Sequence, residues 1–212
     1  MTNTINAARR RFLQISLTAS GALLVGWRSA DAVAPMQSSE LLGDDVTALT
    51  DFVMIERDNR VVIGARGCEV GQGVLTSLPM LIAEELGVNW SQVRVVQLPY
   101  GYTASGNRYG SQDPREPMAN TWIYLRQAGA QARALMLRAA AAEWRVDVEQ
   151  LRSEAGQVLA PDGRKLSYGA LARSAAALPA STAAVRLKDD IDFNIIGHDI
   201  PVADGNELVT GQ

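Results

Sequence analysis

Cysteine and histidine are almost absent from this chain of 212 residues, which holds one of each, Cys68 and His198. A single cysteine excludes an intrachain disulfide framework. A protein-ligated zinc site is not expected either, because such sites usually draw several ligands from these two residue types. Positive charge is also scarce: the formal net charge is −3, so the chain has no basic footprint for a nucleic acid.

What is present is an ordinary globular composition. Hydrophobic residues make up 47% of the chain and charged residues 20%, so a core can be buried. Trp90, Trp122 and Trp144 are expected to pack in the core and not to line a substrate-binding site. Cys68 is expected to be a small buried hydrophobe, and His198 a structural or solvated residue.

The N-terminus has the pattern of an export signal. Arginines at 9–11 precede a mostly apolar stretch over 12–27, and small residues follow it. A charged region, an apolar region and a small-residue region define a signal peptide, and the arginine pair followed by Phe12 and Leu13 is the twin-arginine version. The apolar run falls short of the roughly 20 residues that span a bilayer, which disfavours a membrane anchor. We therefore expect residues 1–34 to direct export to a bacterial periplasm.

The rest of the sequence alternates between strand-like and helix-like patterns. β-Branched residues around turn residues predict strands and hairpins, and apolar residues at helical spacing predict helices. Asn120 or Thr121 is expected to cap the longest helix. This order of elements predicts an α+β fold, with a mixed sheet and packed helices. The expected elements are a hairpin with arms 52–55 and 60–65, helices over 74–86, 121–144 and 167–177, strands over 93–98 and 193–196, and a second hairpin over 154–166.

A Gly-Gln-Gly run stands between a strand-like and a helix-like segment. Gly71 and Gly73 flank Gln72, directly before the helix expected over 74–86. Glycines allow positive φ and let a ligand approach closely, and the free N–H groups of a helix N-terminus suit a phosphate or an electron-rich ring. The Gln72 amide adds a donor and an acceptor. Taken alone, a glycine turn before a helix is more often just a turn.

Six segments of the chain together carry a family resemblance. They are Glu69–Gly73, Thr76–Leu86, Trp90–Val95, Leu125–Ala130, Leu166–Gly169 and Phe193–Gly197. In order and spacing they resemble the N-terminal region of the isoquinoline 1-oxidoreductase β-subunit group. That group belongs to the xanthine dehydrogenase/aldehyde oxidase superfamily of molybdopterin enzymes.

The resemblance implies a molybdopterin cofactor and assigns residues to it. The Gln72 amide would lie near the oxo or pterin side of the cofactor, with Gly71 and Gly73 as backbone contacts. Glu69 is expected to brace this loop and not to catalyse. The superfamily's catalytic base is a glutamate far downstream, so no catalytic residue and no metal ligand is predicted in this chain. The cofactor site would be completed by a segment outside it.

A second cofactor loop departs from the family pattern. The family usually has a Gly-Gly-Ser-x-Ser type run before the long helix, where this chain has Asp113–Pro117. The two prolines and the charges replace small residues that donate hydrogen bonds, and proline has no N–H. Two interpretations remain: a surface loop in a diverged copy, or a remodelled pocket.

The resemblance implies the N-terminal part of a periplasmic molybdenum hydroxylase large subunit. Such an enzyme would oxidise an aldehyde or an N-heterocycle with water. Its expected partners are the remainder of the large subunit, a small iron–sulfur subunit and a cytochrome c subunit, with only indirect membrane association. The alternative is a non-enzymatic interaction module or an inactive fragment of a split gene. The expected divisions are a linker over 35–50, a partial molybdopterin-binding domain over 51–185, and a connector over 186–212 in which residues 208–211 begin a new strand or turn.

Overall fold

The computed structural model describes residues 46–65, 69–98, 118–179 and 185–211, all within one unit that spans Pro35–Gln212. The predicted export signal, Cys68 and the Asp113–Pro117 run lie outside the described residues. Within the described ranges, every helix is too short or too polar to span a bilayer.

A four-stranded mixed sheet forms the base of the fold. β1, β2 and β3 pair antiparallel, and β4 joins β3 in parallel, which confirms the predicted mixed sheet. The predicted hairpin is β2–β3, in which Met54 lies opposite Val62 and the turn residue Asn59 has a φ of 73°. The linker predicted over 35–50 was wrong at its C-terminal end, because Val46–Ala48 form β1. The strands are β1 (Val46–Ala48), β2 (Val53–Glu56), β3 (Val61–Ala65) and β4 (Val93–Gln97).

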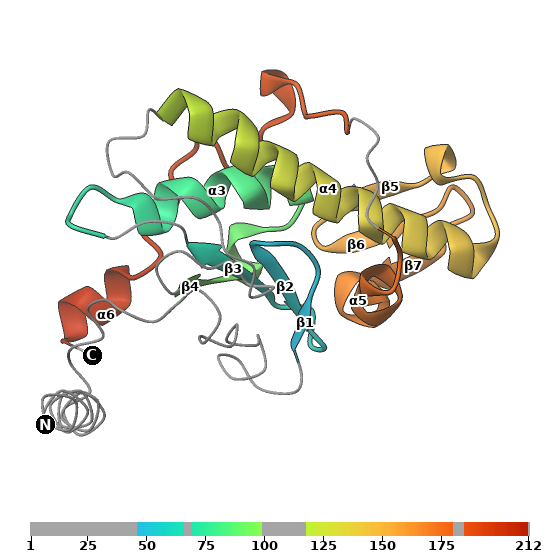
Figure 1. Cartoon of the computed structure of the whole chain (residues 1–212), viewed down its shortest axis with the longest axis horizontal. Coiled ribbons are helices and arrows are strands. Elements are labelled where there is room, and N and C mark those ends of the chain that lie inside the picture. The colour runs from blue at the N-terminus through green and yellow to red at the C-terminus, as the bar shows by residue number, and fades with distance from the viewer. Residues whose placement is uncertain (1–45, 66–68, 99–117, 180–184, 212) are drawn as a thin grey trace, which may run out of the picture. The chain divides into compact units, whose positions relative to one another are not determined.

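Two helices, α3 (Val74–Leu86) and α4 (Met118–Trp144), pack on one side of this sheet (Figure 1). The bounds of α3 agree with the prediction, and Gly87 ends it in a left-handed conformation with a φ of 77°. The predicted cap of α4 was wrong: this helix begins at Met118, so Asn120 and Thr121 lie inside its first turn.

Small residues let α3 and α4 approach closely, as the run of alanines and glycine in α4 predicts. A Cβ atom added at Gly129 would lie 2.3 Å from the backbone oxygen of Ile82 and 3.0 Å from the Cβ of Glu85. Ala132 is fully buried beside this contact zone. The two helix backbones therefore meet at Gly129, and α4 fixes the position of α3.

A second, smaller sheet follows α4. Its strands pair antiparallel, and β6 with β7 forms the hairpin predicted over 154–166, with Pro161, Asp162 and Gly163 between the two strands. The turn before β6, at Ala155 and Gly156, has positive φ at both residues and was not predicted. The Ser167 hydroxyl accepts from the backbone N–H of Ala170 and caps the helix that follows β7, within the predicted range 167–177. The elements are β5 (Arg152–Glu154), β6 (Gln157–Leu159), β7 (Lys165–Ser167) and α5 (Tyr168–Ala176).

The strand predicted over 193–196 is wrong. Its backbone N–H groups pair with a side chain: Asn194, Ile195 and Ile196 all donate to one carboxylate oxygen of Glu84, at 2.9, 2.7 and 3.1 Å. Lys188 donates to the other oxygen at 2.6 Å. Burial alone would raise the pKa of Glu84, but the hydrogen bonds from Lys188 and this backbone hold that pKa below its usual value.

Glu85, the next residue of α3, makes a second buried polar cluster. Its carboxylate lies 2.7 Å from Arg126 and 3.4 Å from Arg133, both of α4. The backbone N–H of Lys188 also donates to this carboxylate, and Arg126 donates in turn to the carbonyl of Lys188. Glu84 and Glu85 therefore attach residues 186–196, predicted to be a connector, directly to α3.

The chain beyond residue 200 was also predicted differently. Residues 208–211 were expected to begin a strand or a turn, but α6 (Gly205–Thr210) occupies most of this range. Leu208 and Val209 project from α6 with 71% and 83% of their surface exposed. Short helices are usually stabilised by packing of their apolar side chains. The exposed Leu208 and Val209 side chains are therefore available for contact with other protein surface.

Candidate cofactor-binding site

The loop that precedes α3 is organised by the carboxylate of Glu69. One oxygen accepts the backbone N–H groups of Gly71 and Gly73 at 2.8 and 3.0 Å, and the other accepts that of Leu75 at 3.0 Å. The hydrogen bonds from Leu75 and Gly73 hold the pKa of the Glu69 carboxyl below its usual value. The carboxylate is therefore ionised at neutral pH and bonds both to the loop and to the first turn of α3.

The Gln72 side chain is exposed, and its amide has a defined orientation. The backbone N–H of Val70 donates to Gln72 Oε1 at 2.7 Å. Only the oxygen of a primary amide accepts a hydrogen bond from an N–H, so this contact distinguishes the two ends of the amide. The other end, Nε2, is a donor, and a ligand atom that it contacts must be an acceptor such as an oxygen.

Gly71 and Gly73 leave one side of the loop without side chains. Their φ angles are 96° and 77°, a region that glycine adopts at no steric cost. Among the described residues beyond its chain neighbours, a Cβ atom at either position would meet no atom within 4 Å, so this part of the structure leaves the space beside both glycines open. A flat, polar molecule can therefore approach the loop backbone at Gly71 and Gly73 without meeting a side chain of either residue.

The free helix N-terminus expected from the sequence is not free at Leu75. The N–H of Leu75, in the first turn of α3, already donates to Glu69. An anionic ligand at this end of the helix would compete with a carboxylate that is part of the same chain. The structure thus favours recognition through the Gln72 amide and the glycine surface over phosphate binding at the helix end.

The first turn of α3 is also tied to the C-terminal segment. The hydroxyl of Ser77 donates to the carbonyl of Gly73 at 2.9 Å, and Thr76 Oγ1 accepts the backbone N–H of Ala203 at 2.9 Å. These contacts hold the start of the helix from both sides. Neither hydroxyl was assigned a function from the sequence, although both begin the Thr76–Leu86 segment that carries the family resemblance.

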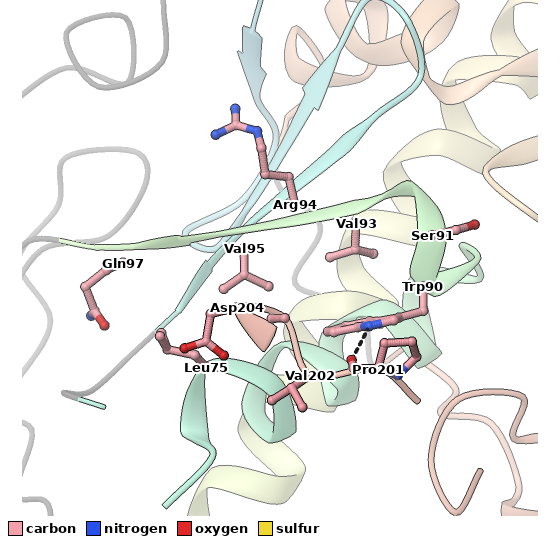
Figure 2. Close-up of a pocket in the computed structure, with 11 residues that line it drawn as sticks. Leu75, Trp90, Ser91, Val93, Arg94, Val95, Gln97, Pro201, Val202 and Asp204 are labelled. Atoms are coloured by element: carbon pink, nitrogen blue, oxygen red, sulfur yellow. Dashed lines mark hydrogen bonds between the residues drawn. The ribbon is translucent and has the colours of Figure 1, made fainter. Parts of the chain in front are cut away.

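A pocket of about 490 Å³ lies next to this turn, along β4 (Figure 2). Figure 2 shows Val93 and Val95 facing Pro201 and Leu75 across it, with the Trp90 indole donating to the Pro201 carbonyl at 3.0 Å. The pocket shares Leu75 with the loop region but does not include Gly71, Gln72 or Gly73. We therefore treat the glycine loop, and not this pocket, as the candidate site.

The other residues considered in the sequence lie apart from the loop or outside the described residues. His198 is exposed, and its ring lies 3.2 Å from the Phe193 carbonyl. Trp90 contacts the C-terminal segment, and Trp144 lies under the guanidinium of Arg164. In the part of the chain that the structure describes, no three His, Cys, Asp or Glu side chains form a group suited to a metal ion. Gly71, Gln72 and Gly73, the three predicted cofactor-binding residues, are consecutive and form the loop before α3.

An α+β domain that presents a glycine-flanked amide on an ordered loop is suited to binding a polar cofactor. Residues 32–198 match the molybdopterin cofactor-binding domain family. The match covers most of the chain, so the protein belongs to this family. The family resemblance inferred from the sequence is confirmed, and with it the class of cofactor.

Three curated proteins are similar to the chain over nearly its whole length. The chain is 29% identical to the isoquinoline 1-oxidoreductase beta subunit of Brevundimonas diminuta, over 99% of the chain and 31% of that protein. It is 28% identical to a nicotinate dehydrogenase subunit of Pseudomonas putida, over 92% and 16%. It is 26% identical to the membrane-bound pyrroloquinoline-quinone aldehyde dehydrogenase of Gluconacetobacter polyoxogenes, over 96% and 27%. The chain therefore spans less than a third of each relative.

Among solved structures, quinoline 2-oxidoreductase from Pseudomonas putida 86 is similar to 68% of this chain. The match covers 18% of that protein, with a TM-score of 0.42 and 19% sequence identity.

Proposed function

We propose that this chain is the N-terminal part of the large subunit of a periplasmic molybdenum hydroxylase. The complete enzyme would oxidise an aldehyde or an N-heterocycle with water. The substrates in the names of the relatives, which are isoquinoline, nicotinate and an aldehyde, support these two substrate classes. The observation that carries the proposal is the Gly-Gln-Gly loop, which is held in one conformation and has open space beside both glycines.

The loop residues fit one wall of a molybdopterin site. Gln72 would hold the cofactor by donating a hydrogen bond from Nε2 to one of its oxygens, because Oε1 is already engaged with Val70. Gly71 and Gly73 would let the cofactor approach the backbone, since nothing lies where their side chains would be. When bound, the cofactor supplies the oxygen transfer and the two-electron chemistry. The role of this chain would be to bind and orient the cofactor.

We propose that the chain works with the remainder of a large subunit, with a small iron–sulfur subunit and with a cytochrome c subunit. Two of the relatives are themselves named as subunits, which supports a multi-subunit enzyme. The twin-arginine pattern of residues 1–34 supports export in a folded, cofactor-loaded state.

Metal analysis tests this function. The chain is purified alone and together with the polypeptide encoded next to it, and molybdenum and pterin are measured in both samples. The proposal predicts molybdenum and pterin in the combined sample, in equal amounts with the chain. Molybdenum absent from both samples would contradict it and leave the alternative, a non-catalytic interaction module or an inactive fragment.

The DNA downstream of the codon for Gln212 separates these two interpretations further. Coding sequence there for the remaining domains of a large subunit, whether it continues the same frame or opens an adjacent one, supports the proposed enzyme. Unrelated sequence supports the non-catalytic module.

A further inference from the structure

We infer that Glu69 is the positioning residue of the Gly-Gln-Gly loop, and that its ionised carboxylate sets the conformation in which Gln72 meets the cofactor. The effect on the cofactor rests on the function proposed above, whereas the effect on the loop does not. That Glu69 braces the loop was expected from the sequence; the new element is that its two oxygens, through the loop backbone, set the orientation of the Gln72 amide.

The first argument is geometric. Three backbone N–H groups, from Gly71, Gly73 and Leu75, converge on the two oxygens of a single side chain at 2.8–3.0 Å. Both glycines have a positive φ. Because glycine has no side chain, no packing contact fixes the backbone at either position. Glycine without such contacts has the largest conformational freedom of any residue. The loop therefore has its fixed shape because the carboxylate orders it.

The second argument is chemical, and it requires a carboxylate. An ionised carboxylate accepts at both oxygens and has no hydrogen to place against the converging N–H groups. Glutamine of the same length would keep one oxygen, on the side of Gly71 and Gly73, but would set an NH₂ group against the N–H of Leu75. Each oxygen of Glu69 thus has a separate function: Oε1 shapes the loop, and Oε2 joins it to α3.

The third argument links Glu69 to Gln72. Val70, which lies between the carboxylate and the first glycine, donates its N–H to Gln72 Oε1 at 2.7 Å. That contact exists only while the loop folds back on itself, as the bonds from Gly71 and Gly73 to Glu69 make it do. Release of the carboxylate therefore frees the orientation of the Gln72 amide without removing any atom of Gln72.

Amide hydrogen exchange of the full chain, followed by NMR, tests the inference. In Glu69→Ala, exchange at Gly71, Gly73 and Leu75 should rise by about tenfold or more, while core amides of β3 keep wild-type rates. In Glu69→Gln, the rise should be confined to Leu75, because the retained oxygen still serves the two glycines. Glu143→Gln removes one exposed carboxylate of α4 and should leave all three amides unchanged.

The Glu69→Gln pattern decides the matter even if Glu69→Ala does not fold. Wild-type exchange at Leu75 in Glu69→Gln would overturn the inference, as would an equal rise across loop and core. A second readout is the molybdenum and pterin retained by each variant when it is purified with the polypeptide encoded next to it. We expect Glu69→Gln to retain several-fold less than Glu143→Gln. If the exchange pattern is observed but wild type itself retains no pterin, the role of Glu69 in ordering the loop is supported and the proposed function is contradicted.

Discussion

Replacing Gly129 by alanine tests the contact that fixes α3, the helix that follows the cofactor loop. The added Cβ would lie 2.3 Å from the backbone oxygen of Ile82 and 3.0 Å from the Cβ of Glu85, and distances below 3.0 Å are essentially never seen for real Cβ atoms. Both obstacles belong to α3 at positions that cannot rotate away. The substitution can be accommodated only if the two helix backbones move apart.

Two opposing effects set the magnitude. Alanine is the better helix former and gains about 1 kcal/mol over glycine in a helix interior. Overpacking a closely packed contact costs about 1–3 kcal/mol, and a clash with backbone belongs at the upper end. We therefore expect Gly129→Ala to lower the free energy of unfolding by about 2 kcal/mol, the difference between the two effects.

Urea unfolding followed by circular dichroism measures this change. Gly205→Ala in α6 is the matched control, because its Cβ would meet Val202 at an ordinary 3.6 Å. We expect the control to stay within about 0.5 kcal/mol of wild type. If Gly129→Ala unfolds at the wild-type urea concentration or above it, helix propensity outweighs packing here, and the close approach of α3 and α4 is refuted.

Three further predictions concern ionisable groups. Glu85→Ala should cost about 3–5 kcal/mol in urea unfolding, because it leaves the buried guanidinium of Arg126 without its carboxylate; a cost below about 1 kcal/mol would mean that the pair contributes little. Burial raises the pKa of Tyr168 to about 12 from 10.0, so the stability from its buried, protonated hydroxyl is complete below pH 10 and is lost as pH rises toward 12. Between pH 9 and 11 wild type should therefore lose about 1 kcal/mol more than Tyr168→Phe, and parallel losses would contradict the burial of this proton. The pKa of Glu69 lies below its usual 4.5, so its bonds are complete above that pH and are lost as pH falls through the lowered value; exchange protection of the loop amides, corrected for intrinsic rates, should fall there in wild type but not in Glu69→Ala.

Local sequence signals predicted the elements that are determined locally. The β2–β3 hairpin follows from β-branched residues around a turn, and α3 follows from apolar spacing closed by Gly87. Pro161, Asp162 and Gly163 mark the β6–β7 turn in the same way. Each of these patterns lies within a dozen residues, where propensity and turn chemistry act.

The predictions were wrong for Phe193–Ile196 and for β1, neither of which shows a local pattern sufficient to predict its structure. Phe193–Ile196 has the composition of a strand, but the Glu84 carboxylate, more than 100 residues earlier in the chain, takes its N–H groups. β1 is short, and it is defined by pairing with β2, not by its own composition. The partner of Phe193–Ile196 lies far away in the sequence, so no local pattern indicates that arrangement. The partner of β1 is near, and β1 was missed because three residues are too few to show a strand pattern.

At the candidate site, the sequence located the loop but not its internal bonding. Gly71, Gln72 and Gly73 form one exposed loop before α3, as predicted. The expectation that Glu69 braces this loop agrees with its three hydrogen bonds. The helix N–H that was expected to be free for a ligand is taken by the same carboxylate, which only the three-dimensional arrangement could show.

The most direct test of the central claim is to locate molybdenum in the assembled protein. Crystals of the chain with the polypeptide encoded next to it are measured at the molybdenum absorption edge, and the anomalous peak is placed relative to Gln72. The account predicts one strong peak beside the Gly71–Gly73 loop, with a cofactor oxygen within hydrogen-bond reach of Gln72 Nε2. A peak bound elsewhere, with this loop facing solvent, would contradict it.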